Sequence, residues 1–226
     1  MSFVSCSLPK SFRRVRIIDD DINMRKSVAN YVHDAGLTPI DVPGPLSSLR
    51  SFVVWAQKNA DGAICDHRLS SLGGGYANFL GADVVCRFYQ SRFPALLCTN
   101  FSTMDVDIVR PYRRYIPVLL RPDDLDPDLI RQGLAYCRDE LKGRFRPERR
   151  PWRTLVRVEA LEEQDKPKMA IIVLPGWSSN ERIRLPLDML PPKLTRGIKA
   201  GTRFHAQVNL GDEDPESLYF DSPELD

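Results

Sequence analysis

The first part of the chain alternates between short apolar runs and longer amphipathic stretches. The apolar runs lack polar alternation, and they lie at 15–18, 38–42, 63–65, 95–99 and 116–120. The stretches that follow them place apolar residues near helical spacing, at 22–35, 46–59, 78–91, 104–113 and 127–141. A strand that is apolar throughout is covered on both faces. The pattern therefore predicts an α/β fold, with a five-stranded parallel sheet inside a three-layer sandwich.

The pattern changes after the last of these helices. A stretch rich in Arg and Pro is followed by strand-like runs at 154–161, 169–174, 183–185 and 204–210, and the first and last of these runs show a period of two. We therefore predict four regions. They are an N-terminal arm at 1–13, an α/β domain at 14–142, a basic linker at 143–153, and a small all-β domain with an acidic tail at 154–226.

Composition places few limits on function. The net charge of the 226 residues is +2, which gives no global field for nucleic acid or a membrane surface. No apolar run approaches the roughly 20 residues that span a bilayer. The five cysteines form no C-x-x-C pair, which is typical of reduced thiols, so we expect a cytoplasmic protein. Solvated segments are the simplest interpretation of the basic linker and the acidic tail.

Carboxylates follow two of the predicted strands. Asp19 and Asp20 come directly after the first strand, and Asp66 follows the third. Because the functional crevice of a parallel sheet lies beyond the carboxyl ends of its strands, these acids are expected to share a pocket. Such a cluster binds a divalent metal, pairs with an arginine or holds a proton. The simpler alternatives remain open: helix capping for the acids at 19–21, and a solvated strand end for Asp66.

The ordered set resembles a known family. Two acids after the first strand, Asp66 after the third, Thr99 after the fourth and Arg121 after the fifth resemble the receiver domain of two-component response regulators. The resemblance covers about residues 14–142 and implies a flavodoxin-like strand order. It does not extend to the β domain.

The resemblance implies a role for each of these residues. Asp66 is the implied phosphoacceptor, which attacks a phosphohistidine of a histidine kinase or phosphotransfer protein in a phosphorelay. Asp20, Asp66 and the backbone carbonyl of Arg68 are the implied direct ligands of Mg²⁺, and Asp19 acts through water. Thr99 is expected to hydrogen-bond a phosphoryl oxygen. This describes a phosphoacceptor signalling protein rather than a turnover enzyme.

Three positions depart from the family pattern. Arg121 stands where receivers usually carry lysine, and arginine is longer and planar. Val118 stands at the usual aromatic switch position. Arg68 adjoins the acids and, like Arg121, is able to pair with Asp66. We expect His67 to be a surface imidazole that points away from the pocket.

Three functional hypotheses follow. The first is a response-regulator-like protein whose β domain is an atypical output or docking module that binds a protein partner. The second is a pseudo-receiver, a scaffold that works without phosphorylation. The third places function in the β domain, with Trp152, Trp177 and Phe204 as stacking residues, although core packing is their simpler interpretation. The acidic tail argues against nucleic acid, and the oligomeric state is open, with a dimer possible.

Overall fold

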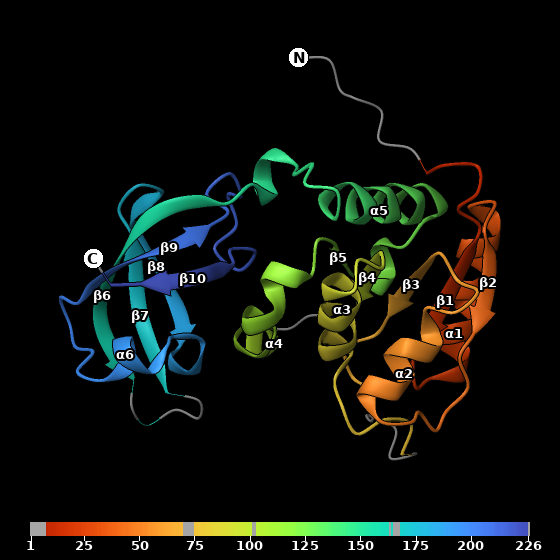
Figure 1. Cartoon of the computed structure of the whole chain (residues 1–226), viewed down its shortest axis with the longest axis horizontal. Coiled ribbons are helices and arrows are strands. Elements are labelled where there is room, and N and C mark those ends of the chain that lie inside the picture. Colours follow the sequence, from red (N-terminus) through yellow and green to blue (C-terminus); the bar gives the residue numbers. More distant parts are fainter. Residues whose placement is uncertain (1–7, 70–74, 101–102, 163, 165–167, 226) are drawn as a thin grey trace. The chain divides into compact units, whose positions relative to one another are not determined.

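The computed structural model describes residues 8–69, 75–100, 103–162, 164 and 168–225. It divides into two compact units (Figure 1). An α/β unit comprises Met1–Phe101 and Tyr115–Arg144, and a β unit comprises Ser102–Arg114 and Phe145–Asp226.

The α/β unit is built on a five-stranded sheet in which every pair of neighbours is parallel. The strand order is β2-β1-β3-β4-β5, which is the flavodoxin-like order. The strands are β1 (Arg14–Ile18), β2 (Thr38–Asp41), β3 (Gly62–Cys65), β4 (Ala95–Cys98) and β5 (Leu119–Leu120). The predicted fold class is confirmed.

Four helices cover this sheet in two layers. Helix α1 (Ile22–Asp34) contacts α5 (Pro127–Glu140), and α2 (Leu49–Ala56) contacts α3 (Gly81–Gln90). The core under α1 and α5 collects residues from both helices and from β1, β3 and β4, among them Val28, Leu134, Ile17, Ile64 and Leu96. These strands are apolar on both sides because each face is covered by a helix pair.

The ends of α1 follow from local chemistry. Asp21 accepts a hydrogen bond from the backbone N–H of Asn23 at 2.7 Å and so caps the helix. Gly36, just past the other end, adopts a φ of 71°, in the left-handed region where glycine is favoured. The turn between β1 and α1 is therefore short, and it holds the acids at 19–21 at the sheet edge.

The arm predicted at 1–13 lies partly outside the described residues. In its described part, Leu8 and Phe12 are buried and join the core of the α/β unit. Their burial anchors the chain directly before β1.

The β unit contains a five-stranded antiparallel sheet of order β10-β9-β6-β7-β8. Its strands are β6 (Trp152–Glu162), β7 (Met169–Leu174), β8 (Ser178–Pro186), β9 (Arg203–Val208) and β10 (Phe220–Glu224). A short 3-10 helix η4 (Leu187–Met189) and helix α6 (Pro192–Thr195) follow β8, and their neighbours Leu190 and Leu194 join the core on one face of the sheet. The predicted small all-β fold is confirmed.

Strand β10 was not expected, because it lies in the segment interpreted as a solvated acidic tail. That interpretation is wrong for 218–220: Leu218 and Tyr219 are fully buried, and Phe220 is 7% exposed. This short apolar run leads into β10, of which Phe220 is the first residue, and β10 completes the sheet. The run has no polar alternation, so it gave no strand period to read.

One helical segment of region 14–142 belongs to the β unit, because most of its contacts are with that unit. It consists of α4 (Thr103–Val109) and the first part of the 3-10 helix η1 (Arg110–Tyr115). Asp107 pairs with Arg184 of β8 at 2.9 Å, and Arg110 donates to the carbonyl of Leu218 at 3.0 Å. Because Ile183 and Leu185 belong to the core on one face of the sheet, Arg184 and its partner lie on the other.

The segment interpreted as a solvated linker also contributes to the β unit. Residues Pro147–Arg149 form the 3-10 helix η3, and Arg149 is 1% exposed. Its guanidinium donates to the carbonyls of Arg113 at 3.1 Å and Arg114 at 2.9 Å and lies over the ring of Tyr219. Burial of this charge is offset by these contacts.

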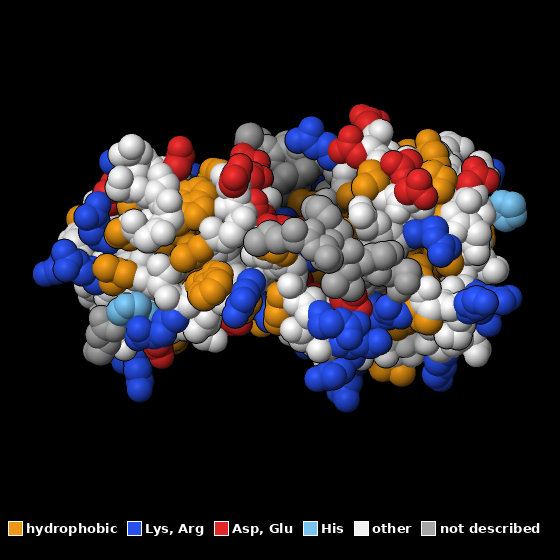
Figure 2. Space-filling view, turned by 90° about the horizontal axis from the view of Figure 1, so that it is seen from above, with side chains coloured by type: hydrophobic (Ala, Val, Ile, Leu, Met, Phe, Trp, Pro, Cys, Tyr) orange, Lys and Arg blue, Asp and Glu red, His pale blue; other side chains and the backbone are white. Residues whose placement is uncertain are grey.

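Both acidic and basic side chains reach the face shown in Figure 2, with hydrophobic side chains between them.

Candidate functional site

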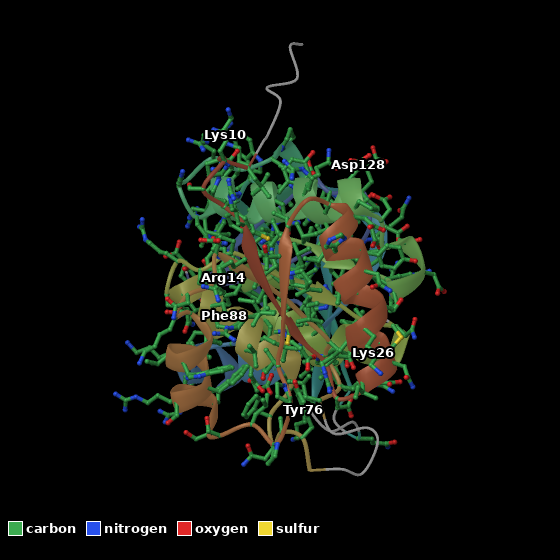
Figure 3. All side chains as sticks on the ribbon, turned by 90° about the vertical axis from the view of Figure 1, so that its right-hand side faces the viewer. Lys10, Arg14, Lys26, Tyr76, Phe88 and Asp128 are labelled. Carbon is green, nitrogen blue, oxygen red and sulfur yellow. The ribbon has the colours of Figure 1, made fainter. Side chains whose placement is uncertain are left out.

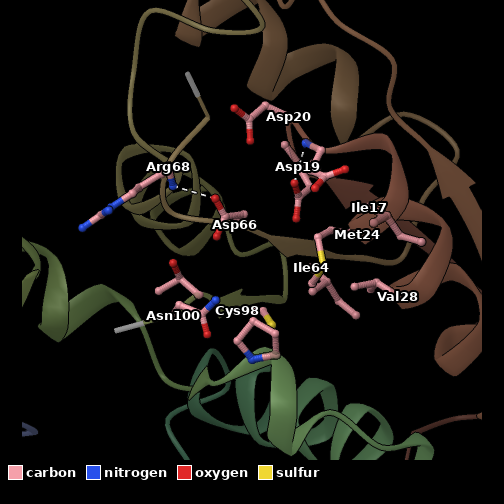
Figure 4. A pocket seen from close by; sticks show the side chains of 14 residues that line it. Ile17, Asp19, Asp20, Met24, Val28, Ile64, Asp66, Arg68, Cys98 and Asn100 are labelled. Atoms are coloured by element: carbon pink, nitrogen blue, oxygen red, sulfur yellow. Dashed lines mark hydrogen bonds between the residues drawn. The ribbon is translucent and has the colours of Figure 1, made fainter. Parts of the chain in front are cut away.

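A cavity of about 280 Å³ lies at the carboxyl ends of β1, β3 and β4. Its floor is apolar, with Ile17, Ile64 and Cys98 among the lining residues. Its polar lining consists of Asp19, Asp20, Asp21, Asp66, Arg68, Thr99 and Asn100. The structure thus brings together the acids predicted to share a pocket (Figure 4).

Asp66 is held in place by groups from two strand ends. Its backbone N–H continues the sheet ladder to the carbonyl of Ile18 at 2.8 Å. Its Oδ2 accepts the backbone N–H of Arg68 at 2.7 Å, and its carboxylate also accepts the hydroxyl of Thr99. Burial raises the pKa of Asp66, and the charge of Asp20 raises it further, against the lowering effect of these hydrogen bonds.

The pKa of Asp19 is also raised by burial and by its acidic neighbours. Burial, together with the charges of Asp66, Asp20 and Asp21, raises the pKa of Asp19 to about 7. A hydrogen bond from the backbone N–H of Asp21 to Oδ1 of Asp19, at 2.8 Å, opposes this rise. The cavity therefore gathers several carboxylates in a partly buried space.

Neither arginine considered for the pocket places its charge there. Arg68 is exposed, and its side chain extends away from the carboxylate of Asp66 (Figure 4). Arg121 is also exposed, and Pro122 rather than Arg121 lines the cavity at that strand end. Within the described residues, Arg121 forms no ion pair with Asp66. Val118, at the expected aromatic position, is buried in the core.

The oxygen atoms that line the cavity decide which cation it could hold. In the described part of the chain, no group of three or more His, Cys, Asp or Glu residues is arranged to hold a metal ion. Mg²⁺ needs less than such a cage, since it keeps several waters and binds proteins through one or two carboxylates. Several oxygen donors line this edge, among them the side chains of Asp19, Asp20 and Asp66. The set suits a largely hydrated Mg²⁺ better than a dehydrated ion.

Comparison with known proteins concerns the α/β unit. No protein-family model matches the chain, and no curated protein matches it. Among solved structures, a response regulator receiver domain protein from Clostridium thermocellum is 14% identical, with 57% of this chain and 97% of that chain covered and a TM-score of 0.44.

Two further solved structures are of the same kind. The chemotaxis protein CheY4 of Vibrio cholerae is 20% identical, with 53% of this chain and 93% of that chain covered and a TM-score of 0.37. The response regulator TrrA of Thermotoga maritima, solved in complex with Mg²⁺ and BeF, is 16% identical, with 48% and 85% covered and a TM-score of 0.36. The parallel sheet of the α/β unit, with its order β2-β1-β3-β4-β5, is the fold that the resemblance of residues 14–142 implies.

The positions of several residues around the site were not predicted from the sequence. His67 is 2% exposed, so its prediction as a surface imidazole is wrong. Gly81, at the start of α3, lies against the backbone of Asp66, where a Cβ would come within 1.7 Å of the carbonyl oxygen. Arg25 and Tyr76 are both 7% exposed beside the acid turn. The spacing of Arg25 on α1 fits an inward-facing position, whereas Tyr76 and Gly81 carry no sequence pattern.

The aromatic residues considered for stacking on bases have different surroundings. Phe204 is fully buried in the core of the β unit. Trp177 is half-buried and donates its indole N–H to the carbonyl of Asp212 at 2.8 Å. Trp152 is 48% exposed and lies under the guanidinium of Arg150. Two of the three are thus engaged within the β unit.

In the described residues, no helix is long and apolar enough to cross a membrane.

Proposed function

We propose that the α/β unit accepts a phosphoryl group on Asp66 from a phosphohistidine of a histidine kinase or phosphotransfer protein. The protein then acts in two-component signalling. One observation carries the proposal. Asp66, held by Thr99 and the backbone of Arg68, shares a cavity with Asp19 and Asp20, and the guanidinium of Arg68 points away from it. This arrangement supports the approach of a phosphoryl donor to the carboxylate of Asp66 and of a cation to the cavity.

The reaction needs positioning more than covalent help. An oxygen of Asp66 attacks phosphorus, the P–N bond of the phosphohistidine breaks, and the imidazole leaves with the electron pair and takes up a proton. The product is an acyl phosphate. Thr99, whose hydroxyl now donates to Asp66, is placed to donate to a phosphoryl oxygen instead. Bound Mg²⁺, held by Asp20 and Asp66, would supply positive charge to the carboxylates and the phosphoryl oxygens.

The ionisation state of Asp66 links the cation to the reaction. Only the carboxylate is a nucleophile, yet burial and Asp20 raise the pKa of Asp66. A cation beside the acids opposes both effects and favours the ionised form. The proposal therefore requires a divalent cation for efficient phosphorylation near neutral pH.

The test is phosphorylation by a small-molecule donor. The full chain is incubated with acetyl phosphate or phosphoramidate and Mg²⁺, and the intact mass is measured. We expect the wild type to gain one phosphoryl group and Asp66→Asn to gain none. Asp34→Asn, which changes an exposed acid at the end of α1, is the matched control and should behave as wild type. Thr99→Val should slow the gain, and Thr99→Ser should preserve it.

A negative outcome would also be informative. If neither small donors nor a histidine kinase add a phosphoryl group to the wild type, or if Asp66→Asn still gains one, the proposal is wrong. Such a result would favour the pseudo-receiver. The exposed position of Arg121, outside the cavity lining, supports that second candidate, because no cation at this strand end is placed to grip a phosphoryl group. In that case partner binding should tolerate Asp66→Ala.

We also propose that the β unit is an output or docking module that binds a protein partner in the cytoplasm. The proposal is supported by Phe204 and Trp177, whose engagement in the fold removes two of the three candidate base-stacking residues. A pull-down of candidate kinases and effectors with the full chain, and a mobility shift with single- and double-stranded DNA, would separate the two partner classes.

A further inference from the structure

Arg25 is a buried charged residue beside the cavity that does not line it. It lies in the second turn of α1, and it is 7% exposed. Its Nε donates to Oδ1 of Asp41 at 2.8 Å, and its Nη1 donates to the backbone carbonyl of Asp19 at 2.6 Å. The ion pair with Asp41 is the simpler reason for its presence. The second bond acts directly on the turn that presents the acids.

Tyr76 extends this contact to a third segment. The guanidinium of Arg25 lies 5.6 Å from the centre of its ring. The Tyr76 hydroxyl donates to the carbonyl of Val42 at 2.6 Å and also interacts with the backbone N–H of Asp19. Figure 3 shows Tyr76 toward the far end of the unit from Lys10, at the edge where the strands end. Arg25 and Tyr76 thus tie together the turn after β1, the end of β2 and the segment between β3 and α3.

The bond to the Asp19 carbonyl has a geometric consequence. A peptide plane is rigid, so fixing the carbonyl of Asp19 fixes the plane that leads into Asp20. The next residue, Asp21, is held by its N–H bond to Asp19 and by its cap on α1. The directions of the Asp19 and Asp20 side chains therefore depend on a backbone that Arg25 braces from behind.

We propose that Arg25 is a positioning residue for the site at Asp66. It orients the Asp19–Asp20 turn so that both carboxylates face Asp66 and a shared cation. Asp41 and Tyr76 hold its guanidinium in the required place. This inference rests on the proposed function. It adds a residue that touches neither the cation nor the phosphoryl group.

The test compares two arginine-to-carbonyl contacts, one near each end of α1. Arg25→Met removes the bond to the Asp19 carbonyl. Arg131→Met is the matched control, because Arg131 donates its Nη1 to the carbonyl of Ala35 at 2.8 Å, at the other end of α1. Mg²⁺ affinity is measured on the full chain by titration calorimetry and by the rise in unfolding temperature with Mg²⁺, neither of which requires phosphorylation. Supporting residues of this kind typically affect metal affinity by roughly 10-fold or more.

The expected result separates positioning from simple support of the fold. Arg25→Met should weaken Mg²⁺ binding roughly 10-fold, raise the Mg²⁺ concentration for half-maximal phosphorylation, and retain most of the rate at saturating Mg²⁺. Arg131→Met should lower stability but leave Mg²⁺ affinity unchanged. Arg25→Lys, which keeps the charge and one donor, should recover part of the affinity. If Arg25→Met does not fold, Asp41→Asn and Tyr76→Phe should shift Mg²⁺ affinity in the same direction.

Two outcomes overturn the inference in distinguishable ways. If Arg25→Met, or its substitutes, lower stability but leave Mg²⁺ affinity within about twofold of the wild type, Arg25 only supports the fold, and the proposed function is unaffected. If the wild type itself neither binds Mg²⁺ nor gains a phosphoryl group, the proposed function fails and the role of Arg25 fails with it.

Discussion

The chemistry of the site depends on individual carboxylates that are crowded and partly removed from water. Asp19 and Asp66 reach the cavity from different strands. Burial raises the pKa of both carboxyls, the charges of Asp66 and Asp20 raise that of Asp19 further, and the charge of Asp20 raises that of Asp66. Several carboxylates gathered in a partly buried cavity cost free energy in the folded state. That cost is the reason to expect a cation, and it also makes the stability of the cation-free protein depend on pH.

This dependence can be measured with Asp19→Asn. The pKa of Asp19 is raised from 3.8 to about 7, so the folded protein holds this proton more tightly than the unfolded chain. The stabilisation is complete below pH 3.8 and is lost as the pH rises through 7. Asparagine stays neutral and can keep the bond from the N–H of Asp21. Without divalent cations, the variant should therefore unfold at a higher temperature than wild type near pH 8, and the difference should shrink near pH 5.

The control for this experiment is Asp34→Asn, since Asp34 is exposed at the end of α1. Its difference from wild type should stay constant with pH. Adding Mg²⁺ should reduce the advantage of Asp19→Asn at high pH, because a bound cation offsets the same repulsion. An advantage that does not change with pH would show that Asp19 is not a titrating group in this range.

At the scale of elements, the start of α3 sets how the Asp66 turn is built. Gly81 donates its N–H to the carbonyl of His67 at 2.8 Å, and its Cα faces the backbone of Asp66. A Cβ there would lie 1.7 Å from the Asp66 carbonyl oxygen and 2.7 Å from its carbon. Both are backbone atoms, so side-chain rotation cannot relieve the clash. The close approach of α3 to the turn that follows β3 therefore requires glycine.

We predict that Gly81→Ala destabilises the protein by at least about 2 kcal/mol and abolishes phosphorylation of Asp66. Gly176→Ala is the control, because the nearest atom to its Cβ would be Oγ1 of Thr154 at 3.4 Å, an ordinary contact. Denaturant unfolding and the mass gain with acetyl phosphate provide the two measurements. Wild-type stability in Gly81→Ala would contradict the packing described here.

The elements also differ in how well the sequence predicts them. Strands β3, β4 and β5 were predictable because each is apolar over its whole length, and the acids because they directly follow β1 and β3. Residues 218–220 were not, since three apolar residues in an acidic segment give no strand period. His67 and Tyr76 were not, because their burial is decided by the loop between β3 and α3 and not by local pattern.

At the scale of the whole molecule, the chain passes between its two units three times. It leaves the α/β unit after Phe101, returns at Tyr115 and leaves again after Arg144. The first crossing comes directly after Thr99 and Asn100, which line the cavity. The segment between the first two crossings, α4 with the start of η1, is built into the β unit through buried arginines. Burial, and then the charge of Arg149, lowers the pKa of Arg113 to about 9.

Arg149 is the residue whose removal tests this organisation. It makes two charge-assisted bonds to the carbonyls of Arg113 and Arg114 and lies over Tyr219, so Arg149→Met should cost about 3 kcal/mol in the β unit. Hydrogen exchange measured by mass spectrometry should show α4, η1 and β10 losing protection together, while β1 and β3 keep theirs.

The control, Arg153→Met, breaks an exposed ion pair with Glu224 and should cost no more than about 1 kcal/mol. If α4 instead loses protection with β1 and β3 in Arg149→Met, the helix belongs energetically to the α/β unit. If α4 keeps its protection while β10 loses it, the buried arginine does not hold the segment. Loss of protection in α4 and β10 together would show that the residues directly following the phosphoacceptor pocket are part of the β unit. A change at Thr99 would then have a covalent route into that unit only a few residues long.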